Sequence, residues 1–379
     1  MRGYYAARRV SRWIATETRV LSLLPQPPTA WRRVALTLLL AYVAARLCVW
    51  LQTPIPWMIG PLLATSLVSV LGARTESWVP FRNAGQWVIG AALGLYFTPQ
   101  VGALIVGLWW AIALGVAWAL ALGLGFGAWL RHHHAAHLPA LSPAQLRSTT
   151  YFASAIGGAS EMTLIAERHG ARTDLVAAAH SLRVLMVTLM VPFALQFWCV
   201  QGIDRLPDAL SAVQPEGLVW LAGLTLLGAG LMRRLGRANP WFMGALLVSM
   251  GLTLSGVVWS AIPTGLINAA QLVIGVSLGV RFTPAFVHTA PRWMASVALA
   301  SVVIMVLCAA FAWVLAAVTG WHPATLVLGT SPGGIAEMAI TAKVLQLGVP
   351  VVTAFQVCRL VAVLVLAEPV FRWWNARQT

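Results

Sequence analysis

Residues 155–162 read Ala-Ile-Gly-Gly-Ala-Ser-Glu-Met, and residues 331–338 read Ser-Pro-Gly-Gly-Ile-Ala-Glu-Met. Each stretch interrupts an apolar run with a pair of glycines and places a glutamate three residues after the second glycine. Glycine relaxes the limits on the backbone angle φ, so each stretch predicts a point where one helix ends and another begins. The pattern appears twice, 176 residues apart, and the rest of the sequence is organised around this repetition.

The composition is that of a polytopic membrane protein. The chain is 59% hydrophobic and 9% charged, with a mean hydropathy of +0.80. A soluble domain of 379 residues does not need so much apolar surface. All but one of its 25 basic residues are Arg, and most lie in short loops between apolar runs. That distribution is the positive-inside pattern of membrane proteins, so we expect a lipid bilayer as partner and no nucleic acid.

The apolar runs form two sets that match in order, which indicates an internal duplication. Residues 56–60, Pro-Trp-Met-Ile-Gly, recur at 240–244 as Pro-Trp-Phe-Met-Gly. Arg183 follows the first Gly-Gly stretch at the same distance as Arg359 follows the second. We expect five segments: a basic arm (1–33), membrane repeat 1 (34–200), a linker (201–216), membrane repeat 2 (217–374) and a short tail (375–379).

The positive charges choose between two topologies. If each Gly-Gly stretch spans the membrane, each repeat has six spans and both repeats face alike. If each stretch is a re-entrant hairpin, each repeat has five spans and the second is inverted. The second model places twenty basic residues inside and only Arg205 and Lys343 outside. We therefore expect an all-α membrane protein of two inverted repeats, each of about five transmembrane helices plus a re-entrant or broken Gly-Gly hairpin. Both termini would be cytoplasmic and the linker periplasmic.

The doubled motifs resemble a known family. The paired Gly-Gly-x-x-Glu-Met stretches, the paired Gln-x-Val-Ile-Gly-x-x-Leu-Gly stretches and the segments that contain Arg183 and Arg359 are similar to those of the AbrB family of bacterial inner-membrane proteins. The resemblance covers roughly residues 34–374 and implies an inner-membrane location. Family labels include regulator of gene expression and ammonia monooxygenase. More distantly, one Gly-Gly hairpin per inverted half is similar to the sodium–citrate and sodium–glutamate symporters, whose hairpins contain more Gly and no matching Glu-Met.

Inverted repeats with broken helices are the architecture of many secondary transporters, whose binding site lies near the bilayer midplane. A carboxylate or guanidinium at that depth is costly, and it usually marks a path for an ion or a substrate. The predicted substrate- or ion-binding residues come from the two Gly-Gly stretches and the two following arginines: Gly157, Gly158, Ser160, Glu161, Arg183, Ser331, Gly333, Gly334, Glu337 and Arg359.

Each of these groups has a structural alternative. Each Glu could simply cap its own half-helix, and each Arg could pair with the Glu of its own repeat rather than with an anionic substrate. Four further polar residues are paired between the repeats and either line the cavity or join helices by hydrogen bonds: Asn83, Gln86, Asn268 and Gln271.

We expect no enzymatic activity, no metal site and no cofactor beyond a coupling H⁺ or Na⁺. The histidines clustered at residues 132–137 are interpreted as a solvated cytoplasmic loop, and the two repeats share no His that could form a doubled metal site. The sequence favours a secondary transporter of a small solute, and we expect that solute to be an organic anion. The alternative is a membrane-bound sensor or regulator that binds a ligand without moving it. The sequence does not determine the oligomeric state, and a homo-oligomer is one of the alternatives.

Overall fold

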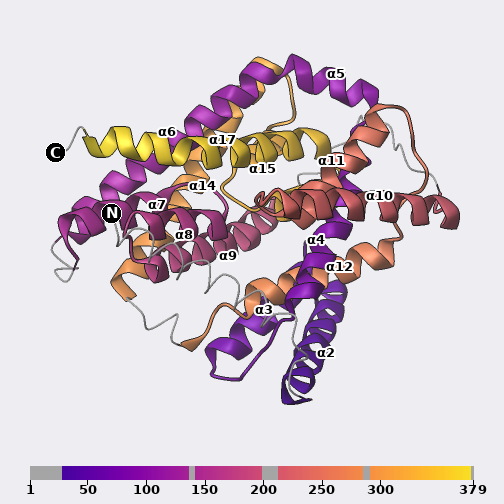
Figure 1. Cartoon of the computed structure of the whole chain (residues 1–379), viewed down its shortest axis with the longest axis horizontal. Helices are drawn as coiled ribbons and strands as arrows, with labels where there is room; N and C mark the ends of the chain where they lie inside the picture. Colours follow the sequence, from indigo (N-terminus) through magenta and orange to yellow (C-terminus); the bar gives the residue numbers. More distant parts are fainter. Residues whose placement is uncertain (1–27, 136–140, 199–211, 285–290, 377–379) are drawn as a thin grey trace.

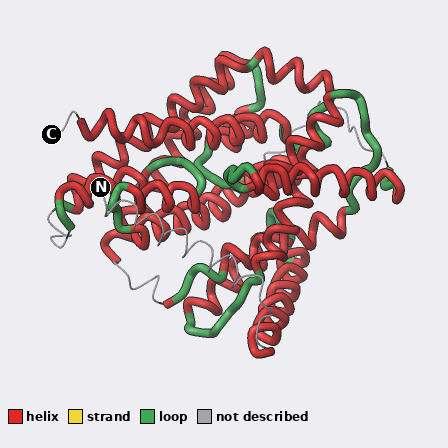
Figure 2. Tube along the Cα trace, viewed as in Figure 1, coloured by secondary structure: helices red, strands yellow, loops and turns green. Residues whose placement is uncertain are grey.

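The computed structural model describes residues 28–135, 141–198, 212–284 and 291–376, and these residues form helices joined by turns and loops (Figure 1, Figure 2). The first half contains α2 (Pro28–Trp50), α3 (Pro56–Val70), α4 (Val79–Gly94), α5 (Pro99–Gly107), α6 (Trp109–His134), α7 (Pro143–Ser154), α8 (Ala159–Arg168) and α9 (Thr173–Phe197). The second half contains α10 (Pro215–Arg234), α11 (Pro240–Leu254), α12 (Thr264–Gly279), α14 (Pro291–Thr319), α15 (Pro323–Thr330), α16 (Ile335–Val344) and α17 (Val349–Ala376). The predicted all-α fold is confirmed.

The backbone repeats its unusual turns at matching places in the two halves. Ile55 and Asn239 both adopt left-handed angles, with φ of 45° and 44°, immediately before α3 and α11. The loops that follow these two helices each contain a glycine at positive φ, Gly72 and Gly256. Positive φ is costly for residues other than glycine, so its recurrence at equivalent positions is strong evidence of a shared local fold.

The two halves also pack on each other reciprocally. A Cβ atom at Gly90 of α4 would lie 2.3 Å from the carbonyl oxygen of Phe242 in α11. A Cβ atom at Gly275, the equivalent glycine of α12, would lie 2.6 Å from the carbonyl oxygen of Met58 in α3. Each repeat therefore offers the other the same close helix crossing, as expected of two units related by an approximate two-fold axis. Only glycine permits backbones to approach this closely.

The helices form two bundles, each containing helices of both halves. The first bundle consists of α2, α3, α4, α10, α11 and α12, and the second of α6, α7, α8, α9, α14, α15, α16 and α17. Contacts between the bundles are made chiefly by α4 against α16 and α17, while α5 touches both. Figure 1 shows α2, α3, α4 and α12 in one part of the view and α6, α7, α8 and α9 in another. The two bundles thus share fewer close backbone contacts than exist within either one. Buried side chains of both bundles nevertheless belong to one hydrophobic cluster, which includes Ile89 of α4, Val187 of α9 and Met338 of α16.

Six of the described helices are long and apolar enough to cross a membrane: α2, α6, α9, α10, α14 and α17. A seventh candidate is the pair α4 and α5, which is bent by 87°. Helices α3, α11 and α12 are apolar but have only 15 to 16 residues. The structure therefore supports a multi-pass membrane protein, whereas ten spans and the inversion of the second repeat stay predictions.

Two expected boundaries differ from those observed. Helix α2 begins at Pro28, inside the predicted arm, because proline fits the first turn of a helix, where no backbone N–H is needed. The predicted histidine loop is also wrong in part, since α6 continues to His134. That residue is buried, and its Nε2 lies 2.9 Å from Oγ of Ser296 in α14. The predicted linker 201–216 and the arm 1–33 lie largely outside the described residues.

Candidate functional site

Both Gly-Gly stretches are helix breaks, as the sequence predicts. Helix α7 ends at Ser154, and α8 begins at Ala159 with Gly158 as its N-cap. In the second half α15 ends at Thr330, and α16 begins at Ile335 with Gly334 as its N-cap. Glu161 and Glu337 each lie in the first turn of the new helix. The N-termini of α8 and α16, which carry a partial positive charge, therefore begin at the breaks beside a carboxylate.

The second glycine of each pair is needed for space rather than for an unusual φ. The backbone angles of Gly158 (φ −66°) and Gly334 (φ −77°) are open to any residue. A Cβ at Gly158 would lie 2.1 Å from Oε2 of Glu161, and one at Gly334 would lie 1.9 Å from Oε2 of Glu337. Each carboxylate thus folds back over its own N-cap, and any side chain at the glycine would displace it from that position.

Arg183 closes the first break from α9. Its Nη2 donates to the carbonyl oxygen of Ala155 at 2.8 Å, and its Nη1 donates to Ser154 at 3.2 Å and to Ala153 at 3.4 Å. These carbonyls belong to the end of α7 and the residue after it, where the helix leaves its acceptors without an internal partner. The side chain is only 4% exposed, so in the bilayer no water would replace these bonds.

Arg359 does the same at the second break from α17. Its Nη1 donates to the carbonyl oxygen of Ser331, and its Nη2 donates to that of Gly333 at 2.9 Å. The side chain is 7% exposed. A guanidinium has five N–H donors in a fixed fork, which suits it to hold two carbonyls of an irregular backbone at once.

One further residue supports each arginine, three positions before it in the same helix. Nδ1 of His180 accepts from Arg183 at 2.7 Å, and its Nε2 lies 2.9 Å from the carbonyl oxygen of Phe152. Oε1 of Gln356 accepts from Arg359 at 2.6 Å, and its Nε2 donates to Leu328 at 2.7 Å. A histidine and a glutamine thus do equivalent work. Each combines an acceptor for the arginine with a donor for the end of the helix.

The predicted ion pair between Arg and Glu of the same repeat is wrong for the described residues. The guanidinium groups of Arg183 and Arg359 bond to carbonyls and to His180 or Gln356, and the ion pairs of the described residues involve other side chains. The arginines still lock each break to the following helix, but through backbone acceptors. Glu161 and Glu337 are therefore left for other partners.

The two breaks pack against the same turn of α17. A Cβ at Gly158 would lie 3.5 Å from Cδ1 of Leu360, and one at Gly157 would lie 3.0 Å from Cγ1 of Val363. Arg359, which holds the carbonyl of Gly333, is the residue before Leu360. Arg183 and Arg359 are also near enough to interact electrostatically. Helix α17 therefore joins the two breaks, although the repeat to which it belongs contains only one of them.

The remaining predicted residues have mixed surroundings. Ser331 is buried, and its Oγ donates to the carbonyl oxygen of Leu328 at 3.2 Å. The side chain of Ser160 lies outside what the structure describes. Gly333 would place a Cβ 2.9 Å from Met338, so it too is short of space.

The four paired amides do not tie helices together. No hydrogen bond joins any of their side chains to another described residue, although Gln271 is only 6% exposed. The cavity-lining role of these four residues stays a prediction: Asn83, Gln86, Asn268 and Gln271.

Sequence reasoning missed two arginines beside the glutamates. Arg82 lies in the first turn of α4 and Arg281 just after α12, and both had been counted only as topology signals. Arg82 is within electrostatic range of Glu161, and Arg281 is within range of Glu337 and of Arg82. Both arginines lie close to the repeated stretches: Arg82 directly precedes Asn83, and Arg281 lies two residues after the second Gln-x-Val-Ile-Gly-x-x-Leu-Gly stretch. This position beside the repeated stretches was the feature of the sequence that could have identified the two arginines as site residues.

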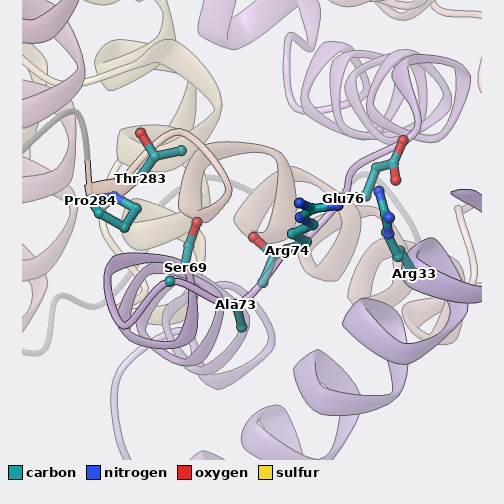
Figure 3. A pocket seen from close by; sticks show the side chains of 9 residues that line it. Arg33, Ser69, Ala73, Arg74, Glu76, Thr283 and Pro284 are labelled. Atoms are coloured by element: carbon teal, nitrogen blue, oxygen red, sulfur yellow. The ribbon is translucent and has the colours of Figure 1, made fainter.

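A polar pocket of about 380 Å³ opens between the end of α3, the start of α2 and the end of α12. Figure 3 shows Arg33, Arg74 and Glu76 together on one side of it and Thr283 and Pro284 on the other. Two of its lining residues follow Arg281 closely in the chain. The pocket therefore lies at the end of α12 that carries this arginine.

The comparisons with known proteins place the chain in a family. The family model described as transition state regulatory protein AbrB matches residues 57–375. The uncharacterized protein YhjN of Bacillus subtilis (strain 168) is 24% identical over 347 residues, which cover 84% of this chain and 87% of the relative. A protein of Escherichia coli (strain K12) whose name describes it as a regulator, AbrB, is 24% identical over 327 residues, covering 84% of this chain and 90% of that protein. The matched region includes both helix breaks and both arginines that hold them, and the chain belongs to the AbrB family.

Proposed function

We propose that this protein is a secondary transporter of a bacterial inner membrane that moves a small organic anion in exchange for, or together with, H⁺ or Na⁺. One observation carries the proposal: two helix breaks, one from each half, pack on one turn of α17. A buried arginine donates hydrogen bonds to the backbone carbonyls of each break. Irregular backbone at membrane depth is tolerated only where protein or a water-filled cavity covers it. Keeping two such breaks beside two carboxylates is typical of a site for ions and solutes.

The two-bundle arrangement supports the same function. A transporter must open its site to each side in turn, which needs two bodies that move past each other. Here few close backbone contacts join the bundles, chiefly at α4 and the connecting α5, while packing inside each bundle is extensive. The side chains that the bundles share are apolar, which suits surfaces that slide past each other. The second bundle contains both breaks, and the first contributes the unbonded amides of α4 and α12.

The charges at the site suit an anion coupled to a cation. Glu161 and Glu337 are the groups that would hold H⁺ or Na⁺, because neither forms an ion pair with a described residue. Arg183 and Arg359 spend their donors on the backbone. Their role in the proposal is to shape the breaks rather than to contact the solute.

Inverted repeats belong to the proposal as well. Gly85 of α4 packs on residues 270–274 of α12, whereas Arg82, earlier in α4, is within electrostatic range of Arg281, which follows the end of α12. Moving forward along α4 therefore corresponds to moving backward along α12, so the two helices are antiparallel. An antiparallel arrangement of two equivalent helices supports inversion, with both termini and the positive loops on the cytoplasmic side.

Uptake by reconstituted protein tests the transport function. Purified protein in liposomes is supplied with labelled organic acids under a pH or sodium gradient, and uptake is compared with that of empty liposomes. Glu161→Gln and Glu337→Gln keep the size and hydrogen bonding of the side chain but remove the charge, so the gradient should no longer drive uptake. Glu216→Gln, at the exposed start of α10, is the matched control and should behave as wild type. Unchanged ion dependence in both site variants would refute the coupling role.

A second candidate function is a membrane-bound sensor or regulator. The name of the Escherichia coli relative and the description of the family favour it. Such a protein would bind the same solute without moving it. Saturable binding to the purified protein, combined with uptake no faster than in empty liposomes, would favour the sensor.

A further inference from the structure

Arg82 and Arg281 are cations without a partner at the junction of the two halves. Both side chains are partly buried. Neither side chain forms a hydrogen bond or an ion pair with another described residue, and Nε of Arg82 is fully buried without an acceptor. Guanidinium groups stay ionised in proteins. A buried charge normally has a partner, so two unpaired arginines in the described part of the chain require an explanation.

The fold brings these two like charges near each other. Helices α4 and α12 cross with almost no space between them, since a Cβ at Gly85 would lie 2.9 Å from the carbonyl oxygen of Ala270. Arg82 lies one turn from this crossing, and its charge and that of Arg281 repel each other. Packing alone would not select such an arrangement. An anion between them would turn the repulsion into attraction to a shared ligand.

Each arginine also faces one glutamate at a distance longer than an ion pair. Arg82 is attracted to Glu161, and Arg281 to Glu337, yet neither pair reaches contact. The glutamates come from the second bundle and the arginines from the first or its edge. The charged groups therefore lie where the two bundles face each other, and the Nη atoms of both arginines form no hydrogen bond with a described residue.

An open pocket adjoins the end of α12 that carries Arg281. Its volume of about 380 Å³ is enough for a small organic acid, and it is lined by two more arginines, Arg33 and Arg74. A pocket with excess positive charge raises the local concentration of anions and speeds their arrival. Figure 3 shows the charged side chains of Arg33, Arg74 and Glu76 gathered on one side of this pocket.

We propose that Arg82 and Arg281 bind the two carboxylates of a small dicarboxylate, one on each guanidinium fork. The inference rests on the proposed transport function and names its substrate class. A planar fork accepts a carboxylate through two parallel hydrogen bonds, so a dianion satisfies both arginines where a monoanion satisfies only one. Glu161 and Glu337 then compete with the substrate for the same two charges. Neutralising a glutamate with a cation frees its arginine, which links the binding of the cation to that of the dianion.

Binding of simple dicarboxylates to purified protein tests this assignment. Thermal-shift titrations with malonate, succinate and glutarate are compared with propionate, which has one carboxylate, and with succinamide, which has none. At least one dicarboxylate should bind ten times more tightly than propionate, and succinamide should not bind. Arg82→Gln and Arg281→Gln should each weaken the best dicarboxylate at least tenfold. The matched control, Arg234→Gln, removes an exposed arginine at the end of α10 and should bind as wild type.

Two further variants separate binding from folding. Glu161→Gln and Glu337→Gln should strengthen dicarboxylate binding at fixed sodium and pH because they remove the competing charge, and a purely structural role for the arginines predicts no such gain. If Arg82→Gln does not fold, Arg82→Lys keeps the charge, loses the fork and should give an intermediate affinity.

Three results overturn the inference: wild-type affinity in both arginine variants, equal binding of propionate and the best dicarboxylate, or no stabilisation by any dicarboxylate. If Arg82→Gln and Arg281→Gln both retained ion-driven uptake of another solute, the dicarboxylate site would be disproved and the transport function would stand. If dicarboxylate binding depended on both arginines but produced no uptake, the transport function would be disproved and the binding site would stand.

Discussion

Replacing Arg359 by methionine should destabilise the protein strongly, because it removes the donors that hold the second helix break. Methionine replaces the aliphatic stem of arginine by an unbranched apolar side chain and lacks the guanidinium. The carbonyl oxygen of Gly333 and Oε1 of Gln356 would then lose their arginine donor in a site where the arginine is 7% exposed. The carbonyl oxygen of Ser331 would keep a donor, because it also accepts from Nε2 of Gln356 at 3.1 Å. An unsatisfied buried acceptor costs about 1–3 kcal/mol. Two of them give a loss of roughly 2–6 kcal/mol in the free energy of unfolding.

The control is Arg372→Met at the exposed end of α17. Arg372 forms an ion pair with Glu368 at 2.5 Å, but its side chain is 71% exposed. An exposed pair of this kind contributes about 0–1 kcal/mol. Unfolding by sodium dodecyl sulfate titration in mixed micelles gives both free energies under the same conditions. The difference between the two variants isolates the effect of burial and of the backbone acceptors.

Stability of Arg359→Met within about 0.5 kcal/mol of wild type, the range of an ordinary surface substitution, would refute the reasoning. If that variant instead kept its stability and lost affinity for the solute, Arg359 would be a ligand for the solute rather than a support for the backbone. Arg359→Lys provides an intermediate case, because one ammonium keeps the charge without the fork and should recover part of the loss.

Other predictions address the glutamates, the histidine and the topology. Gly334→Ala should leave stability nearly unchanged but alter the ion dependence of uptake, because the new Cβ displaces only the flexible end of Glu337. The control is Gly251→Ala, which has open space around it and should only stabilise α11 by up to about 1 kcal/mol. The same ion dependence of uptake in both variants would contradict the role given to Glu337. His180→Gln should melt and transport like wild type, since Gln356 does the same work in the other half, and a large loss would point to a titrating role for the imidazole. In a cysteine-free background, a periplasmic thiol reagent should label a cysteine at His322 and not one at Arg234, whereas labelling at Arg234 would disprove inverted repeats.

The sequence alone determined the membrane class, the duplication and the positions of both helix breaks. Apolar run length, repeated motifs and glycine pairs are local properties, so they can be read without knowing what packs on what. Gly158 and Glu161 are where the motif predicts them, and their counterparts in the second half follow the same pattern. The reason for the second glycine was nevertheless wrong, because the carboxylate and not φ excludes a side chain.

Only the tertiary structure decided which groups meet. Arg183 and Glu161 are 22 residues apart in the chain and looked like a natural pair, yet Arg183 bonds to the carbonyls that end α7. Arg82 and Arg281 looked like topology signals in separate loops, and the crossing of α4 and α12 places them in one electrostatic cluster. A charge selects its partner by distance and desolvation in the folded state. The spacing of residues in a sequence does not contain that information, since it depends on how one half packs on the other.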